Sequence, residues 1–86
     1  FQCPACKSFA LNTLPAVERG LRGQVTVVFR HWPLSYHEHA RSAAIAAECA
    51  SRQQHFREFH DELYRRQQDI GRTSFVEFAQ HAGVPD

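Results

Sequence analysis

Two cysteines near the start of the chain, Cys3 and Cys6, are separated by Pro4 and Ala5 in the sequence CPAC. A CxxC pair serves either as a redox-active dithiol or as half of a zinc site. Because proline fits the first position of a helix, Pro4 predicts a helix that begins inside the motif and leaves Cys3 at or near its N-cap. Unpaired backbone N–H groups and the helix dipole stabilise a thiolate there, so we expect Cys3 to be the attacking sulfur.

Cys6 lies one helical turn after Cys3 and is expected to resolve a mixed disulfide. Residues on its face recur at the spacing i, i+3, i+4 and i+7, namely Cys6, Phe9, Ala10 and Thr13. Such a face normally turns toward the core. We therefore predict that Cys6 is the less accessible of the two sulfurs.

The alternative for the pair is a non-catalytic zinc-binding or interaction module that uses Cys3, Cys6 and histidines. Tetrahedral zinc needs two further ligands, usually a second CxxC or an HxxxH pair, and the sequence contains neither. His37 and His39 form HEH, far along the chain from the cysteines. We therefore favour the dithiol and assign no metal ligand and no cofactor beyond the dithiol itself.

Other chemically capable side chains have simpler expected roles. Cys49 falls on the apolar side of an alanine-rich segment, where a lone cysteine is usually a small buried hydrophobe. His55 and His60 border a helix stripe, which predicts a surface or core-edge role. His31 follows a predicted strand and approaches the CxxC only if that strand end lies beside the helix start.

The elements that must position the cysteines begin with the helix at Pro4. Pro15 disturbs it, so the segment TLPAVERGL is either a kinked continuation or a second short helix that starts near Thr13. Gly20 and Gly23 are expected to end it.

The segment VTVVFR, Val25 to Arg30, is predicted to be the one strand of the chain, because it is rich in β-branched residues and lies between glycine and proline. Apolar residues on both of its faces indicate a strand covered on both sides, as in an α/β sheet. One strand cannot form a sheet, so its partners are expected outside this segment.

Three helices are predicted after the strand. Ala40 to Arg52 has one narrow charged stripe and is expected to be mostly buried. The segment from His55 to Gln68 carries one apolar stripe, formed by Phe56, Phe59 and Leu63. Ser74 and Glu77 form a capping-box pattern for a last helix, which Gly83 closes.

Composition narrows the classes of function. The chain has 86 residues, 43% hydrophobic, and a formal net charge of +1, which fits one small globular unit and gives no basic stripe for nucleic acid. No apolar run approaches the ~20 residues of a membrane span. Because the sequence contains no methionine, we expect it to be a segment of a longer chain.

Four motifs occur in order along nearly the whole chain: FQCPAC, VVFRHWPL, HEHARSAAIAAECA and FREFHDELYRRQ. This series resembles the DsbA-like thiol-disulfide oxidoreductases of the thioredoxin superfamily. The resemblance implies an α/β, thioredoxin-like fold with a helical insertion, of which residues 1–86 form a part that lacks the preceding strand and the cis-proline half. Ala5 stands where strong oxidants of this family carry histidine.

The resemblance also implies a function for the dithiol. Cys3 and Cys6 would form the disulfide that is exchanged with cysteines of protein substrates, and a membrane quinone-linked thiol oxidase would reoxidise it. A periplasmic or otherwise extracytoplasmic location is expected, with a cytoplasmic one left open. A reductase or isomerase role stays open as well, because direction follows reduction potential and partner rather than motif.

Overall fold

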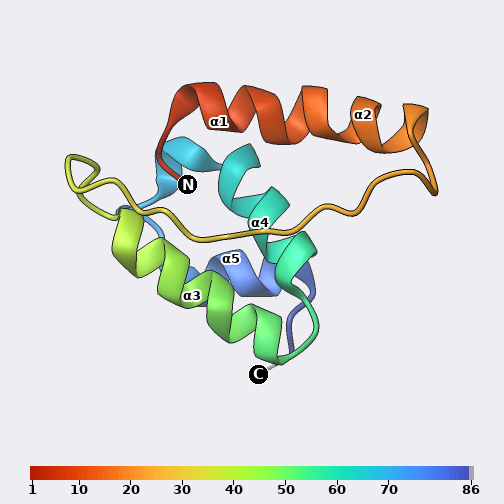
Figure 1. Cartoon of the computed structure of the whole chain (residues 1–86). Coiled ribbons are helices and arrows are strands. Elements are labelled where there is room, and N and C mark those ends of the chain that lie inside the picture. The colour runs from red at the N-terminus through yellow and green to blue at the C-terminus, as the bar shows by residue number, and fades with distance from the viewer. Residues whose placement is uncertain (86) are drawn as a thin grey trace.

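The computed structural model describes residues 1–85, and its regular elements are all helical within that range (Figure 1). In chain order they are α1 (Pro4–Ser8), the π-helical η1 (Phe9–Thr13), α2 (Leu14–Gly20), α3 (Ala40–Arg52), α4 (Phe56–Arg65), the 3₁₀ turn η2 (Gln67–Asp69) and α5 (Phe75–Ala82). No helix in the described part is long and apolar enough to cross a bilayer.

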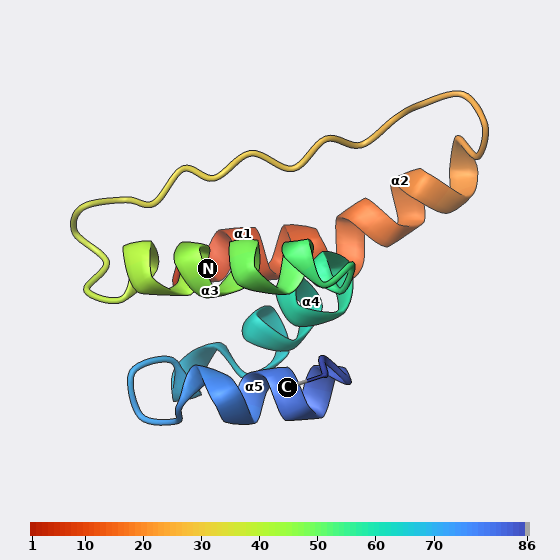
Figure 2. The same cartoon turned by 90° about the horizontal axis from the view of Figure 1, so that it is seen from below.

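The first three elements form one continuous helical rod that bends between α1 and α2, so the alternative of a kinked continuation is the correct one (Figure 1 and Figure 2). Proline has no N–H to donate, and its ring crowds the preceding turn. The chain adapts by widening that turn into a π-helix, in which the N–H of Leu14 donates to the carbonyl of Phe9. The rod ends at Gly20, as predicted.

The prediction of a strand at Val25 to Arg30 is wrong. The chain there runs extended from the end of α2 back toward the start of α1 (Figure 2). It forms no ladder, because the only bridge among residues 1–85 joins Ile70 to Thr73. Val28 is 67% exposed, so the expected cover on both faces is also wrong. A β-branched sequence favours extended backbone, but hydrogen bonds to a neighbouring strand are what make it a strand.

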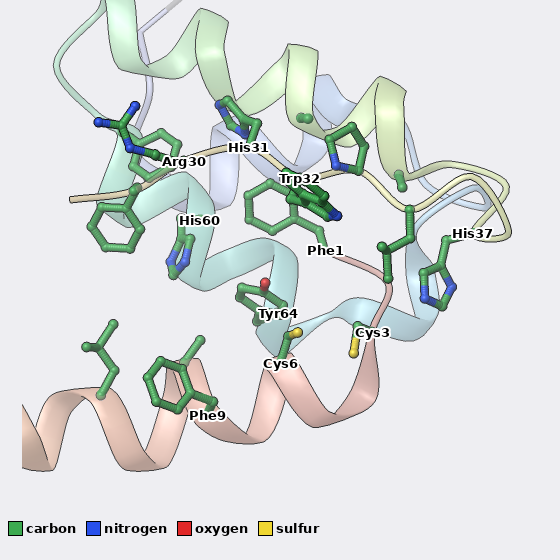
Figure 3. A pocket seen from close by; sticks show the side chains of 18 of the residues that line it. Phe1, Cys3, Cys6, Phe9, Arg30, His31, Trp32, His37, His60 and Tyr64 are labelled. Atoms are coloured by element: carbon green, nitrogen blue, oxygen red, sulfur yellow. The ribbon is translucent and has the colours of Figure 1, made fainter. Parts of the chain in front are cut away.

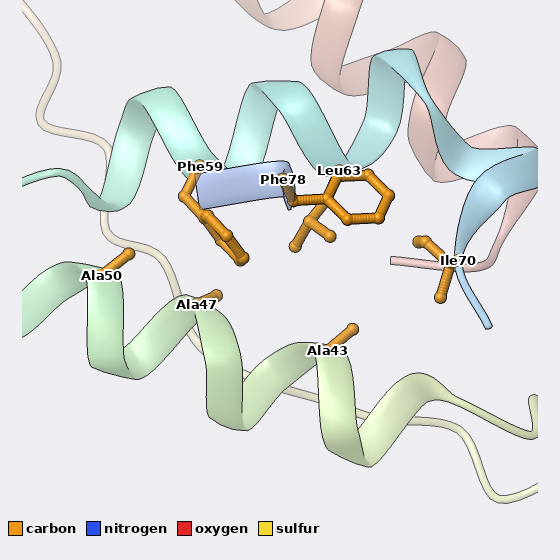
Figure 4. Packing of buried hydrophobic residues seen from close by; sticks show 7 residues of the cluster. All are labelled: Ala43, Ala47, Ala50, Phe59, Leu63, Ile70 and Phe78. Carbon is orange, nitrogen blue, oxygen red and sulfur yellow. The ribbon is translucent and has the colours of Figure 1, made fainter. Parts of the chain in front are cut away.

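The hydrophobic core lies between α3, α4 and α5 (Figure 4). Alanines of α3 let α4 pack close, and the buried side chains of the cluster are Ala43, Ala47, Ala50, Phe59, Leu63, Ile70 and Phe78. The predicted apolar stripe of α4 is thus confirmed at Phe59 and Leu63. The prediction that α3 is mostly buried is wrong, because only its alanine face meets other helices and Ile45 remains 56% exposed.

Local capping signals in the sequence are confirmed at α5. The side chain of Ser74 accepts a hydrogen bond from the backbone N–H of Glu77 at 3.3 Å. Gly83 ends the helix with φ of +80°, a left-handed conformation that glycine adopts without steric cost.

One ion pair ties the rod to the helical core. Arg57 of α4 donates from its two terminal nitrogens to the two carboxylate oxygens of Glu18 in α2, at 3.2 and 2.8 Å. Such a bidentate pair fixes orientation as well as distance. It therefore sets how the helix that carries the CxxC lies over α4.

Candidate redox site

Cys3 occupies the N-cap of α1, as the sequence predicts. Its backbone is extended, with φ of −78° and ψ of 119°, and Pro4 is the first helical residue. Its carbonyl accepts the first helical hydrogen bond, from the N–H of Lys7 at 3.1 Å. Both cysteines of the motif are free thiols, and their sulfurs lie at the edge of the same pocket (Figure 3).

The two thiols have opposite tendencies to ionise. Cys3 closes no side-chain capping bond of standard geometry, but the backbone N–H of Cys6 and then the Cys6 thiol favour its thiolate, and they lower the pKa of Cys3. The same sharing of a proton, with Cys6 as the donor, raises the pKa of Cys6, and partial burial adds to this. The arrangement thus gives one sulfur that ionises readily and a neighbour that keeps its proton.

As whole residues, Cys6 is exposed and Cys3 is half-buried, so the expected burial of Cys6 on this face is not observed at the level of the residue. Of the two sulfurs, that of Cys6 is the more desolvated, as the sequence predicted. The helix face that Cys6 shares with Phe9 does turn toward the rest of the molecule, but it meets an open pocket rather than packed side chains, and Phe9 is 52% exposed. Helical spacing predicted the shared face correctly; what lies opposite that face is not encoded in the spacing.

The pocket beside the cysteines has a volume of about 440 Å³. One wall is the rod, with Phe9 and Leu14. The second wall is the extended segment from Val27 to Leu34, and α4 contributes the third (Figure 3). Its walls are mainly aliphatic and aromatic, so a thiol reaction at its edge takes place beside apolar surface.

His60 and Tyr64 of α4 also line this pocket, and sequence reasoning missed both of them. With Phe56 they recur every four residues, a spacing that places all three on one helix face. That periodicity could have revealed them. Of the two roles expected for His60, the surface one is wrong, because His60 is buried; it lies outside the core cluster and lines the pocket, as a core-edge residue does. Figure 3 shows Tyr64 next to Cys6, with His60 further along the same helix.

Burial controls the ionisation of both side chains. It lowers the pKa of His60, although Nδ1 lies 2.8 Å from a carboxylate oxygen of Asp61, which acts in the opposite direction. Burial, followed by the charges of Cys6 and Cys3, raises the pKa of Tyr64 to about 12. At neutral pH this wall of the pocket therefore presents an uncharged imidazole and an uncharged phenol to the thiols.

Of the remaining histidines, His31 and His37 reach the pocket and His39 does not. His31 comes near the site as its position after the extended segment allows, but its Nε2 pairs with Glu48 of α3 at 3.0 Å. Across the residues that the structure describes, no three His, Cys, Asp or Glu side chains are grouped so that they could hold a metal ion.

Cys49 does not take part in this site. The sequence predicted a small buried hydrophobe, and that is wrong, because the structure exposes Cys49 on α3. The alanines two positions before it and one after it face the core instead. Periodicity located the apolar half of the helix correctly, but that half is wider than the surface that α4 and α5 cover.

Comparison with known proteins gives a family for this arrangement. A family model described as thioredoxin matches residues 1–86. A Na(+)/H(+) antiporter NhaA 3 from Salinispora tropica is 36% identical over 83 residues, which is 93% of this chain but only 12% of the length of that relative. No solved structure matches. The fold prediction is thus supported at the level of the family, although the described residues form helices alone. The chain belongs to the thioredoxin family.

Proposed function

We propose that the chain is the CxxC-bearing part of a DsbA-like thiol-disulfide oxidoreductase, with Cys3 as the attacking and accepting sulfur and Cys6 as its partner. The observation that carries the proposal is the asymmetry of the pair. Cys3 sits at a helix N-cap with a lowered pKa, whereas the pKa of Cys6 is raised. An enzyme of this kind needs one sulfur that attacks readily and also leaves readily as a thiolate. Its second sulfur stays protonated until it resolves a mixed disulfide.

The proposed exchange starts from the oxidised Cys3–Cys6 disulfide. A substrate thiolate attacks the sulfur of Cys3, a mixed disulfide forms, and Cys6 leaves as a thiolate that takes up a proton. A second thiolate of the same substrate then attacks the substrate sulfur of the mixed disulfide and releases Cys3 as a thiolate. The substrate gains a disulfide and loses two electrons, and the CxxC gains two electrons and becomes the dithiol.

The proposed partners follow from the DsbA-like motifs rather than from the pocket. They are protein thiols as substrates and a membrane quinone-linked thiol oxidase that reoxidises the dithiol, in a periplasmic or otherwise extracytoplasmic location. The antiporter relative does not move the proposal toward ion transport, because this chain corresponds to only 12% of its length.

A redox titration tests the proposal. The 86-residue chain is equilibrated with glutathione buffers of graded reduction potential. Free thiols are then trapped by alkylation at low pH, and the fraction of oxidised chain is measured by mass spectrometry. We expect one reversible two-electron transition that involves Cys3 and Cys6 and leaves Cys49 unpaired. Bound zinc is assayed in parallel. A stoichiometric metal that protects both thiols, together with no reversible transition, would support the zinc-binding alternative and refute the oxidoreductase.

A further inference from the structure

The backbone that precedes α1 is held by a side chain from the other end of the molecule. The amide nitrogen of Gln67, in η2, donates to the carbonyls of Phe1 and Cys3 at 2.8 and 2.9 Å. Carbonyls two residues apart in an extended chain point to the same side, so one amide can reach both. Figure 1 shows the turn after α4 lying beside the start of α1.

The orientation of this amide is fixed by its partners. A glutamine amide carries two N–H donors on nitrogen and lone pairs on oxygen. If the amide of Gln67 were turned over, its oxygen would face two carbonyl oxygens and both hydrogen bonds would be lost. Both donors are therefore committed to the segment that leads into the CxxC.

The same segment is held from a second direction. The side-chain oxygen of Gln2 accepts a hydrogen bond from the backbone N–H of His39 at 2.7 Å. The ring of His39 in turn lies directly on Gly71, which has φ of +92° and where any Cβ would collide with the ring. Gln67 thus holds the backbone on both sides of Gln2, and His39, from a third part of the chain, holds the side chain of Gln2 itself.

The carbonyl of Cys3 is the point where this clamp meets the redox site. It accepts from Lys7, as the first bond of the helix, and from Gln67. Two donors on one carbonyl fix the plane of the peptide bond between Cys3 and Pro4. That plane determines ψ of Cys3 and so the position of its side chain relative to the N–H groups at the helix start.

We propose that Gln67 is a positioning residue of the redox site, which holds Cys3 in the N-cap geometry where the helix start stabilises its thiolate. The inference rests on the proposed function, because it assigns Gln67 a part in the reactivity of Cys3. Gln67 does not touch the sulfur, so its effect is expected in how readily Cys3 ionises and not in an added reaction step.

The test compares Gln67→Met with Gln68→Met in the reduced 86-residue chain. Methionine keeps the length of the side chain and removes its donors, and Gln68 is an exposed neighbour in the same 3₁₀ turn. The alkylation rate of Cys3 is followed from pH 4 to 9 by mass spectrometry of its peptide. We expect Gln67→Met to raise the midpoint of the profile by about half a pKa unit, a rate loss of roughly threefold at acidic pH. Gln68→Met should match the parent chain.

An unchanged profile in a Gln67→Met chain with the helical circular dichroism of the parent would overturn the inference. A measurement on the parent chain covers the case in which the variant does not fold. The side-chain amide protons of Gln67 should exchange with deuterium more slowly than those of Gln68, and equal rates would likewise overturn it. A parent chain without a reversible Cys3–Cys6 transition would instead refute the proposed function, so the two failures are distinguishable.

Discussion

The two halves of the molecule treat their apolar residues differently. The helical core, formed by α3, α4 and α5, buries Phe59, Leu63 and Phe78 almost completely. The redox half, residues 1–34, also contains many large apolar side chains but leaves most of them open to solvent, and Trp32 is 84% exposed. Stability is therefore concentrated in one half, and the chemically capable thiols lie in the other.

The open surface of residues 1–34 lies next to the thiols. Four of the uncovered side chains of the redox half, Phe9, Val28, Phe29 and Trp32, line the pocket that the CxxC borders. The helical core contributes one wall of the pocket through α4, so one side of the pocket belongs to a well-packed helix.

The largest expected effect separates chemistry from stability. Cys3→Ser should abolish thiol-disulfide exchange, because serine cannot form the disulfide, and Cys6→Ser should accumulate mixed disulfides at Cys3 for lack of a resolving thiol. Neither should lower the thermal midpoint as a core substitution does, since neither thiol is part of the core. Exchange with a cysteine-containing peptide and mass analysis of trapped species measure both. If Cys6 in Cys3→Ser were trapped faster than Cys3 in Cys6→Ser, the assigned roles of the two sulfurs would be reversed.

The second effect tests where stability resides. Leu63→Ala removes a fully buried side chain from the helical core and should lower the free energy of unfolding by about 2–5 kcal/mol. Phe9→Ala removes a larger side chain from the redox half but should cost only about 0.5 kcal/mol, because half of that ring already faces solvent. Urea unfolding followed by circular dichroism gives both values. Equal losses would mean that the halves share one cooperative core.

A smaller effect depends on pH and concerns His60, in the wall of the pocket that α4 contributes. His60 has a lowered pKa in the folded chain, so the unfolded chain binds more protons between that pKa and the ordinary value near 6.5. The free energy of unfolding should therefore rise as pH rises through this window. Burial lowers the pKa of His60 and outweighs Asp61, which raises it, while Arg57 and the N-terminal amine act in the same direction as burial. In His60→Phe, which keeps an aromatic ring among its neighbours, that part of the slope should disappear; a slope equal to that of the parent would assign it to other groups.

The smallest expected effect concerns the connection between the halves. Arg57 lowers the pKa of Glu18, so their pairing contributes stability above the ordinary carboxyl pKa and loses it as pH falls through the lowered value. Glu18→Gln should reduce the thermal midpoint at neutral pH and low salt. The difference should shrink at 1 M salt, where screening acts over about 3 Å. A difference that is the same at pH 3 and pH 7 would contradict an ionic origin.

The helical core could be predicted from sequence because its signals are local. The caps at Ser74 and Gly83 and the stripe of Phe59 and Leu63 are each encoded within a few neighbouring residues. The position of Cys3 at the start of a helix belongs to the same class, since Pro4 alone marks it. These features need no knowledge of what packs against them.

The parts that could not be predicted depend on distant partners. Val25 to Arg30 has the composition of a strand, but whether it forms one is decided by a second strand and not by its own residues. The accessibility of Cys6 depends on how far the extended segment lies from α1. The contacts of Gln67 with Phe1 and Cys3 join residues more than sixty positions apart, and no local pattern encodes them.

The π-helical turn at Phe9 to Thr13 sets the direction in which the cysteines face. One end of the rod is anchored by the ion pair between Glu18 of α2 and Arg57 of α4, and the other end carries the CxxC. Each residue of an α-helix advances the chain by about 100° around the axis. The extra residue accommodated in the π turn therefore rotates the thiols relative to the anchor by a comparable angle. The number of residues between Cys6 and Pro15 thus sets the direction in which the two cysteines face around the helix axis. Pro15, by forcing the π-helical turn, changes the orientation of one end of the helix relative to the other.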